Sequence, residues 1–177
     1  IHKLINHIKR EAVKASKLLD YKTEGAVFGE GANFFVLSNE KKATSYAEVL
    51  SIQLFNTLNQ SEVSEAALRF LKDNNMTVKD IDLIVLGNNG DVDYDTYYDI
   101  LSGELFENTQ QVYYKHLCGE FNTASSFGLW LASKILKTQT LPEIVKLNNL
   151  NIPNFKTIFL YNQYRGKNHS FTLLKSC

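Results

Sequence analysis

Several residue types that mark particular protein classes are scarce in this 177-residue sequence. It holds two cysteines, Cys118 and Cys177, which are too few for a disulfide framework and fit a reducing compartment. No apolar run approaches the roughly 18 residues of a membrane helix, and no apolar segment with a cleavage site marks a signal peptide. We therefore expect a cytoplasmic protein without a membrane partner.

A net charge is also lacking, because 19 Lys and Arg residues balance 19 Asp and Glu residues. Proteins that bind nucleic acid through phosphate contacts usually carry a basic excess, so we expect no nucleic-acid partner. The chain has no internal repeat, low-complexity tract, Pro-rich linker, or metal or cofactor signature, so we expect no cofactor and no metal. The 44% apolar and 21% charged residues are typical of a globular domain with its own core.

Hydrophobic spacing predicts the local structure. Near the start it indicates a helix over 2–19 and a strand over 26–37 that begins among glycines. Later strands are expected over 46–55, 81–86, 111–114, 157–161 and 170–174, and helices over 61–75, 93–106 and 123–138. A loop over 162–169 should join the last two strands.

The same patterns predict the core. In the strand 46–55 the expected core residues are Ala47, Val49, Ile52 and Leu54. In the helix 123–138 they are Phe127, Trp130, Leu131, Ile135 and Leu136. The short, continuous apolar run over 81–86 is typical of a strand that is buried on both faces.

From residue 46 onward the predicted order of elements is β-α-β-α-β-α-β-β. This alternation predicts an α/β fold in which helices pack on a sheet with parallel strands. Binding and catalytic sites in such folds lie at the carboxyl ends of the strands. Three predicted loops meet there, over 87–95, 115–122 and 162–169.

Four segments together resemble the β-ketoacyl-acyl-carrier-protein synthase family. GAVFGEGANFFVLS and the following SYAEV are similar to its Gly-Glu-Gly-Ala strand and the Ala-Glu strand after it. NNMTVKDIDLIVLGNNGDVDYD lies where the family has a strand, a His-Gly-Thr loop and an Asp, here Asp95. YYKHLCGEFNTASSFGLWLASKIL resembles its Lys-x-x-x-Gly-His turn and the small-residue helix that follows. YNQYRGKNHSFTLL resembles its closing glycine-rich hairpin, with Gly166 and Asn168 in matching positions.

The resemblance implies a duplicated thiolase fold, in which two β-α-β-α-β-α-β-β halves stack in five layers. Residues 41–177 would form the C-terminal β-ketoacyl-synthase-like domain, a mixed five-stranded sheet with helices on its faces. Residues 1–40 would be a remnant helix and strand of the N-terminal half. Because the sequence starts at Ile1 and its only methionine is Met76, we expect a fragment or a processed chain.

The chemistry that the resemblance implies is incomplete. A ketosynthase needs a Cys nucleophile, which belongs to the other half, and two His that assist decarboxylation and stabilise the oxyanion. Gly87 and Glu120 occupy the two His positions, whereas the family Lys is retained as Lys115. Gly has no side chain, and Glu donates no hydrogen bond unless it is protonated. We therefore assign no catalytic residue. The candidate substrate-binding residues are Asn88, Asn89, Lys115, Gly119, Glu120, Gly166 and Asn168.

This pattern resembles the degenerate, chain-length-factor-type members of the family, which lack the active residues and pair with a catalytic ketosynthase. We expect a non-catalytic partner subunit in fatty acid, polyketide or aryl-polyene type biosynthesis. Its partners would be a catalytic ketosynthase subunit or a second copy in a dimer, and an acyl carrier protein. One alternative is an active acyltransferase or 3-oxoacyl synthase, in which Glu120 or His116 replaces a lost His. Another alternative is a small α/β binding or oligomerisation module.

Three further local patterns bear on the function. Cys118 lies between His116 and Glu120, as a nucleophile would, but triad partners usually meet across a fold rather than along the chain. Arg165 stands where the family hairpin has a glycine, which puts the gating and oxyanion role of that loop in doubt. Alternating carboxylates resemble a calcium loop that lacks its Gly and closing Glu, so an acidic helix N-terminus is favoured. These carboxylates are Asp91, Asp93 and Asp95.

Overall fold

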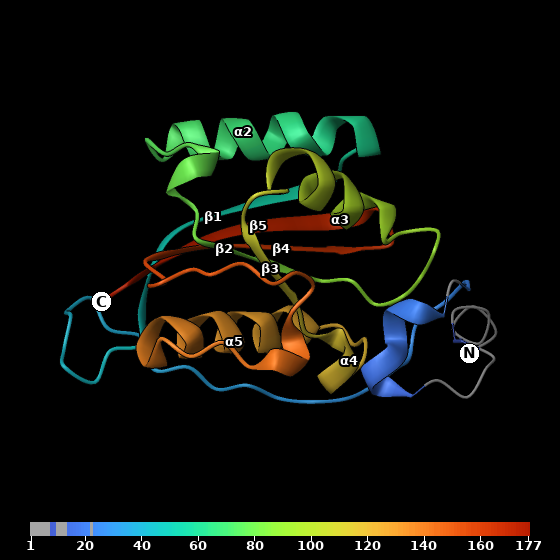
Figure 1. Ribbon diagram of the computed structural model, residues 1–177, viewed down its shortest axis with the longest axis horizontal. Coiled ribbons are helices and arrows are strands. Elements are labelled where there is room, and N and C mark those ends of the chain that lie inside the picture. The colour runs from blue at the N-terminus through green and yellow to red at the C-terminus, as the bar shows by residue number, and fades with distance from the viewer. Residues whose placement is uncertain (1–7, 10–13, 22) are drawn as a thin grey trace.

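A mixed five-stranded sheet forms the middle layer of the computed structural model, which describes residues 8–9, 14–21 and 23–177 (Figure 1). Its strand order is β1-β5-β4-β2-β3. β2 is parallel to β3 and β4, whereas β5 is antiparallel to β4 and β1. The strands are β1 (Ala47–Thr57), β2 (Leu83–Leu86), β3 (Gln110–Tyr113), β4 (Thr157–Tyr164) and β5 (Lys167–Ser176). The predicted α/β class and mixed five-stranded sheet are confirmed.

Helices cover both faces of this sheet (Figure 1). One face carries α2 (Val63–Asp73) and α3 (Thr96–Ile100), and α3 continues as a π-helical turn over Leu101–Leu105. The opposite face carries α4 (Lys115–Cys118) and α5 (Ala124–Thr138). Short 3-10 segments lie at Ala15–Asp20, Gln60–Glu62, Val78–Asp80 and Glu143–Val145. Among the helices of the described residues, none is long and apolar enough to cross a membrane.

The helix α2 shows how local sequence rules set the first of these layers. A capping box begins the segment before it, in which the Asn59 backbone N–H donates to Glu62 Oε2 at 2.7 Å. The buried residues recur at helical spacing: Val63, Ala66, Ala67, Phe70 and Leu71. This apolar stripe packs on the sheet. Asn75 then takes a left-handed φ of 56° just after the helix, which ends it.

Strand β2 and helix α5 form the centre of the fold. All four residues of β2 are buried, because helices cover both faces of the sheet at this point, and the sequence prediction for this run is confirmed. On α5, Leu131, Ile135 and Leu136 are buried as predicted. Trp130 is instead 41% exposed, so its assignment to the core is wrong. Its ring packs against Phe127, with centroids 5.2 Å apart, at the surface of α5.

The predicted strand over 26–37 is wrong. Its backbone runs past α5 on the side away from the sheet (Figure 1), but only Ala26 and Phe28 form isolated bridges. Beyond residue 29 this stretch has no backbone partner strand among the described residues. Phe34 and Val36 are 94% and 101% exposed. The sequence has the composition of a strand, but no neighbouring strand is present to pair with it.

Three predicted core residues of β1 are also exposed. Val49, Ile52 and Leu54 have exposed fractions of 41%, 57% and 74%. Val49 pairs with Leu174, which belongs to the core on the α5 side, so this stripe lies on the α5 face of the sheet. β1 is an edge strand, and α5 does not extend over it far enough to bury these side chains. Of the predicted set, Ala47 alone packs against that core.

Element boundaries differ in two further places. The expected loop over 162–169 is a two-residue turn, because β4 continues to Tyr164 and β5 begins at Lys167. Arg165 and Gly166 form this turn with φ angles of 54° and 68°, as in a type I′ hairpin. Of the predicted helix over 2–19, residues 15–19 form part of a 3-10 helix, and residues 2–7 and 10–13 lie outside the described residues.

A glycine on α5 generates a testable prediction about packing. A Cβ at Gly128 would lie 2.8 Å from Tyr114 Cε1 and 3.1 Å from Leu160 Cδ1. We expect Gly128→Ala to lower the free energy of unfolding by about 1–3 kcal/mol through overpacking, although Ala favours helix. Urea denaturation measures the change. Gly103→Ala is the matched control, because no atom lies within 4 Å of a Cβ there, and it should not destabilise. Equal effects of the two substitutions would contradict the prediction.

Candidate functional site

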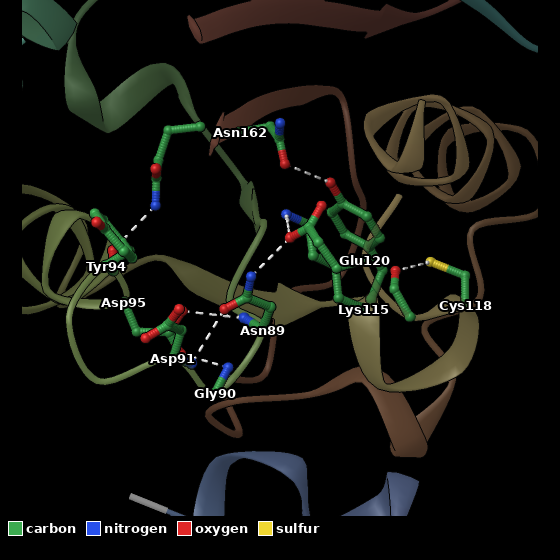
Figure 2. Close-up of polar contacts among 12 residues, drawn as sticks. Asn89, Gly90, Asp91, Tyr94, Asp95, Lys115, Cys118, Glu120 and Asn162 are labelled. Carbon is green, nitrogen blue, oxygen red and sulfur yellow. Dashed lines mark hydrogen bonds and ion pairs between the residues drawn. The ribbon is translucent and has the colours of Figure 1, made fainter. Parts of the chain in front are cut away.

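The carboxyl ends of the parallel strands β2, β3 and β4 meet at one edge of the sheet. In α/β folds, binding and catalytic sites lie at this edge. The loop after β2 runs from Gly87 to Asp95, the turn after β3 holds Lys115 and Glu120, and Asn162 lies near the end of β4. Figure 2 shows these side chains pointing toward one another. Three segments that are separate in the sequence thus meet at the edge where the sequence predicts the site.

A buried ion pair occupies the centre of the site. Lys115 Nζ lies 2.6 Å from Glu120 Oε2, and the two residues are 1% and 5% exposed. Asn89 Nδ2 donates a second hydrogen bond to the same carboxylate oxygen at 2.7 Å (Figure 2). Glu120 thus neutralises the only buried lysine of this turn and accepts hydrogen bonds from two loops.

The backbone fixes Glu120 from the other side. Its N–H donates to Val27 O at 2.8 Å, and its carbonyl oxygen accepts the Gly29 N–H at 3.1 Å. Gly119 has a φ of 74°, and a Cβ there would lie 2.5 Å from Gly29 N. Only glycine allows the two backbones to approach so closely. The role of Gly119 is therefore structural in this turn.

Asp95 organises the loop after β2. Its carboxylate accepts the backbone N–H groups of Asn89 at 3.0 Å and Gly90 at 2.8 Å (Figure 2). Burial raises the pKa of Asp95 to about 6, although these two hydrogen bonds act in the opposite direction. Lys9 Nζ donates to Gly90 O at 2.7 Å and Thr23 O at 2.8 Å, so the N-terminal segment holds the same loop.

The carboxylates of the calcium-loop pattern bind backbone groups in the structure. Asp95 faces backbone N–H groups, and Asp91 Oδ1 accepts the Asp93 N–H at 3.2 Å. Within residues 8–9, 14–21 and 23–177, no group of three or more His, Cys, Asp or Glu side chains is arranged to hold a metal ion. The carboxylates of Asp91 and Asp95 thus stabilise the loop after β2.

Gly87 stands in a space that other side chains fill. A Cβ at this position would lie 2.6 Å from Asn162 Oδ1 and 2.7 Å from Tyr98 Oη. Neither atom is free to move, because Tyr114 Oη donates to Asn162 Oδ1 at 3.0 Å. Tyr98 Oη accepts the Gln163 backbone N–H at 3.0 Å and donates to its carbonyl at 3.2 Å. No side chain larger than hydrogen fits at Gly87 unless this network breaks.

The thiol and imidazole of the turn after β3 do not form a catalytic pair. Burial raises the pKa of Cys118 to about 11, so the thiol stays protonated near neutral pH. Cys118 Sγ donates to Gly119 O at 3.3 Å. Burial lowers the pKa of His116, whose ring stacks on Tyr113 with centroids 4.0 Å apart. No contact joins the two, and the nucleophile reading of Cys118 finds no support in the geometry.

The structure groups only part of the candidate set. Asn89, Lys115 and Glu120 are in contact, and Gly119 supports their turn. Asn88 is buried beside them, with Oδ1 lacking a hydrogen-bond partner in the described protein. Gly166 and Asn168 belong to the β4–β5 turn region, and none of their recorded contacts reaches the ion pair.

Sequence reasoning missed three residues of the site. These are Tyr98, Tyr114 and Asn162, which surround Gly87. Tyr98 falls in the predicted helix over 93–106, Tyr114 ends the predicted strand over 111–114, and Asn162 begins the predicted loop over 162–169. For Tyr114 and Asn162, the position at or next to a strand end is the one signal that the sequence offers. Tyr114 contacts Asn162 across 48 residues of the chain, and Tyr98 contacts Gln163 across 65 residues.

Comparison with solved structures identifies the fold. The ishigamide ketosynthase/chain length factor aligns with a TM-score of 0.68 and 15% identity, over 98% of this chain and 49% of that one. A chain from a complex of a type II polyketide synthase acyl-carrier protein with its ketosynthase aligns with a TM-score of 0.64 and 14% identity, over 98% and 51%. The PfaC keto synthase-chain length factor aligns with a TM-score of 0.59 and 15% identity, over 74% and 13%.

The described structure therefore has the thiolase-like fold of ketosynthases, as the resemblance implied. The chain spans about half of the length of two of these proteins and a smaller share of the third. No family model matches the sequence, and no curated protein matches it. The likeness thus lies in the fold.

The buried ion pair predicts an asymmetric response to substitution. We expect Lys115→Met alone to lower the free energy of unfolding by about 3–5 kcal/mol, because it leaves the Glu120 carboxylate buried without its cation. Lys115→Met combined with Glu120→Leu should restore much of this loss, since no unpaired charge then remains. Chemical denaturation of both variants measures the difference. A double variant that is as unstable as the sum of the single variants would refute this account.

Asp95 predicts a pH dependence of stability. Its pKa is about 6 in the folded protein and about 3.8 when unfolded, so the native state holds the proton more tightly. The stability due to Asp95 is therefore present below pH 3.8 and is lost as the pH rises through 6. Relative to Asp95→Asn, the wild type should lose about 2 kcal/mol between pH 4 and pH 7. Denaturation of both proteins at the two pH values tests this, and a constant difference would contradict it.

Proposed function

We propose that this chain is part of a ketosynthase-like protein of acyl-chain biosynthesis that does not itself catalyse condensation. It acts as a chain-length-factor-like partner of a catalytic ketosynthase. The observation that carries the proposal is the filled space at Gly87, where Asn162 Oδ1 and Tyr98 Oη occupy the volume that a catalytic side chain would need. The proposed pathway makes a fatty acid, a polyketide or an aryl-polyene type product.

The second His position supports the same proposal. Decarboxylation requires hydrogen-bond donors directed at a developing enolate oxygen. Glu120 supplies no such donor, because its carboxylate accepts hydrogen bonds from Lys115 and Asn89. The Lys115 ammonium is neutralised by the same carboxylate. The retained lysine thus serves the ion pair instead of a substrate.

The uncovered apolar surfaces support the proposed division at residue 40. Phe34 and Val36 project from an extended segment without partner strands, and Ile52 and Leu54 lie on an open part of the α5 face. A large exposed apolar area in a folded protein usually marks an interface. We propose that residues 1–40, with Phe34 and Val36, belong to an N-terminal thiolase-like unit. Residues 41–177 form the C-terminal domain, and the N-terminal unit packs on its exposed face at Ile52 and Leu54.

The partners follow from this proposal. A catalytic ketosynthase subunit would supply the nucleophile and the two His that this site lacks. The other candidate partner is a second copy in a dimer, which would carry the same Gly87 and Glu120. An acyl carrier protein would deliver the chain to the catalytic subunit. The relatives named above include ketosynthase/chain length factor proteins and a complex with an acyl-carrier protein, which supports this choice of partners.

The alternative of an active enzyme with altered chemistry has less support. Glu120 would have to act as the base while held in a 2.6 Å ion pair with Lys115. The His116 ring is stacked on Tyr113, and no hydrogen bond joins it to the Lys115–Glu120 ion pair. No specific observation favours a small binding or oligomerisation module over the partner-subunit role.

A condensation assay tests the proposed function. The complete protein, with whatever precedes Ile1, is incubated with acyl- and malonyl-carrier protein, alone and together with a partner synthase. We expect no condensation by the protein alone, and a changed product chain length when the partner is present. Robust condensation by the protein alone would overturn the proposal. If that activity is abolished by Glu120→Gln, the altered-chemistry alternative is correct.

A further inference from the structure

Arg165 is held in an unfavourable backbone conformation at the tip of the β4–β5 hairpin. Its φ is 54°, and Gly166 follows with a φ of 68°. Two-residue turns of this kind favour Asn or Asp at the first position and Gly at the second, because the first residue must take a left-handed conformation. A long side chain with an ordinary Cβ adopts it only at an energetic cost. Such local strain is most often found at functional sites.

The guanidinium group of Arg165 is also short of partners. It has five N–H donors, yet its single recorded hydrogen bond runs from Nη2 to Tyr94 Oη at 3.4 Å. Its Nε is buried and has no hydrogen-bond partner among the described residues. No carboxylate of the described chain lies within ion-pair distance. A buried donor without a partner is a second cost, which the fold itself does not offset.

The environment of this group is preorganised. Arg165 Cζ lies 5.2 Å above the centroid of the Tyr94 ring, which orients the guanidinium plane. Gln163 holds the Tyr94 backbone and the turn together. Its Nε2 donates to Tyr94 O at 3.0 Å, and its Oε1 accepts the Gly166 N–H at 2.7 Å. A Cβ at Gly166 would lie 2.7 Å from Tyr97 Oη, so the turn is packed against α3.

Two carboxylates close to Tyr94 in the sequence accept hydrogen bonds from backbone N–H groups of their own loop. Asp95 accepts two backbone N–H groups, and Asp91 accepts the N–H of Asp93. Lys167, two residues beyond Arg165, is exposed and adds a second positive charge to the turn. Tyr94 itself lies at the same edge of the sheet as the ion pair, on the far side of Asn89 (Figure 2). The turn therefore presents an unneutralised cation beside the candidate site.

We propose that Arg165, assisted by the Tyr94 hydroxyl, binds an oxyanion, which is a phosphate or a carboxylate group, beside the candidate site. A planar guanidinium binds either group through two parallel hydrogen bonds, and such a bond satisfies the donors that the chain leaves unpaired. Bound oxyanion also explains why a strained arginine stands where asparagine or glycine would be more stable. The proposal does not depend on the proposed function, since it holds for a catalytic or a non-catalytic protein.

NMR spectroscopy of the arginine side chains tests the proposal directly. The Nε–H signal of Arg165 is followed while inorganic phosphate, acetate or chloride is added at matched ionic strength. We expect a saturable shift with phosphate or acetate and none with chloride, and the tighter of the two identifies the oxyanion. Arg69, which is exposed on α2, is the internal control and should shift equally little with all three salts.

Substitutions separate binding from a purely structural role. Arg165→Asn should raise the melting temperature, because Asn tolerates the left-handed φ, and should abolish the phosphate- or acetate-induced shift of the Gly166 amide. Arg165→Lys should weaken binding at least tenfold, since an ammonium group lacks the bidentate geometry. Absence of a saturable shift beyond that of chloride overturns the proposal. A lower melting temperature of Arg165→Asn, together with that absence, would show that the arginine only braces the turn.

Discussion

The ion pair between Lys115 and Glu120 is the constraint on which the site depends. Two charges removed from water require both each other and further hydrogen bonds, and here Asn89 supplies one. Glu120 must therefore lie between the loop after β2 and the turn after β3. The close backbone contact of Gly29 with Gly119 holds it there. The geometry of the sheet edge and the neutralised charge of Lys115 both follow from this pair.

The second constraint is packing around Gly87. Tyr98 comes from the α3 layer, Tyr114 from the end of β3, and Asn162 from β4, so the filled space connects three elements. Gly128 lets the Tyr114 ring lie against α5, and this placement directs its hydroxyl to Asn162. A larger side chain at Gly87 would therefore require changes at Tyr98 and Asn162 as well. The proposed non-catalytic role rests on this packing.

The exposed features divide into two kinds. Phe34, Val36, Ile52 and Leu54 are apolar groups that a further layer of protein would bury. Arg165 is a polar group whose donors a small anion would satisfy. The first kind concerns assembly and the second concerns a ligand, so they bear on different aspects of the protein. Both are costs in the isolated chain that a partner or a ligand would offset.

The sequence by itself determined the elements with strong local signals. The apolar run of β2, the helical stripe of α2 and the order of strands and helices all follow from periodicity, which short-range forces set. The positions of Gly87, Lys115 and Glu120 were also readable, because motif spacing places them at strand ends. Only the tertiary structure decided which of them touch. It paired Glu120 with Asn89, filled the space at Gly87 and left the 26–37 segment without a sheet. These outcomes depend on contacts between residues far apart in the chain, and no local pattern records whether a neighbouring layer is present.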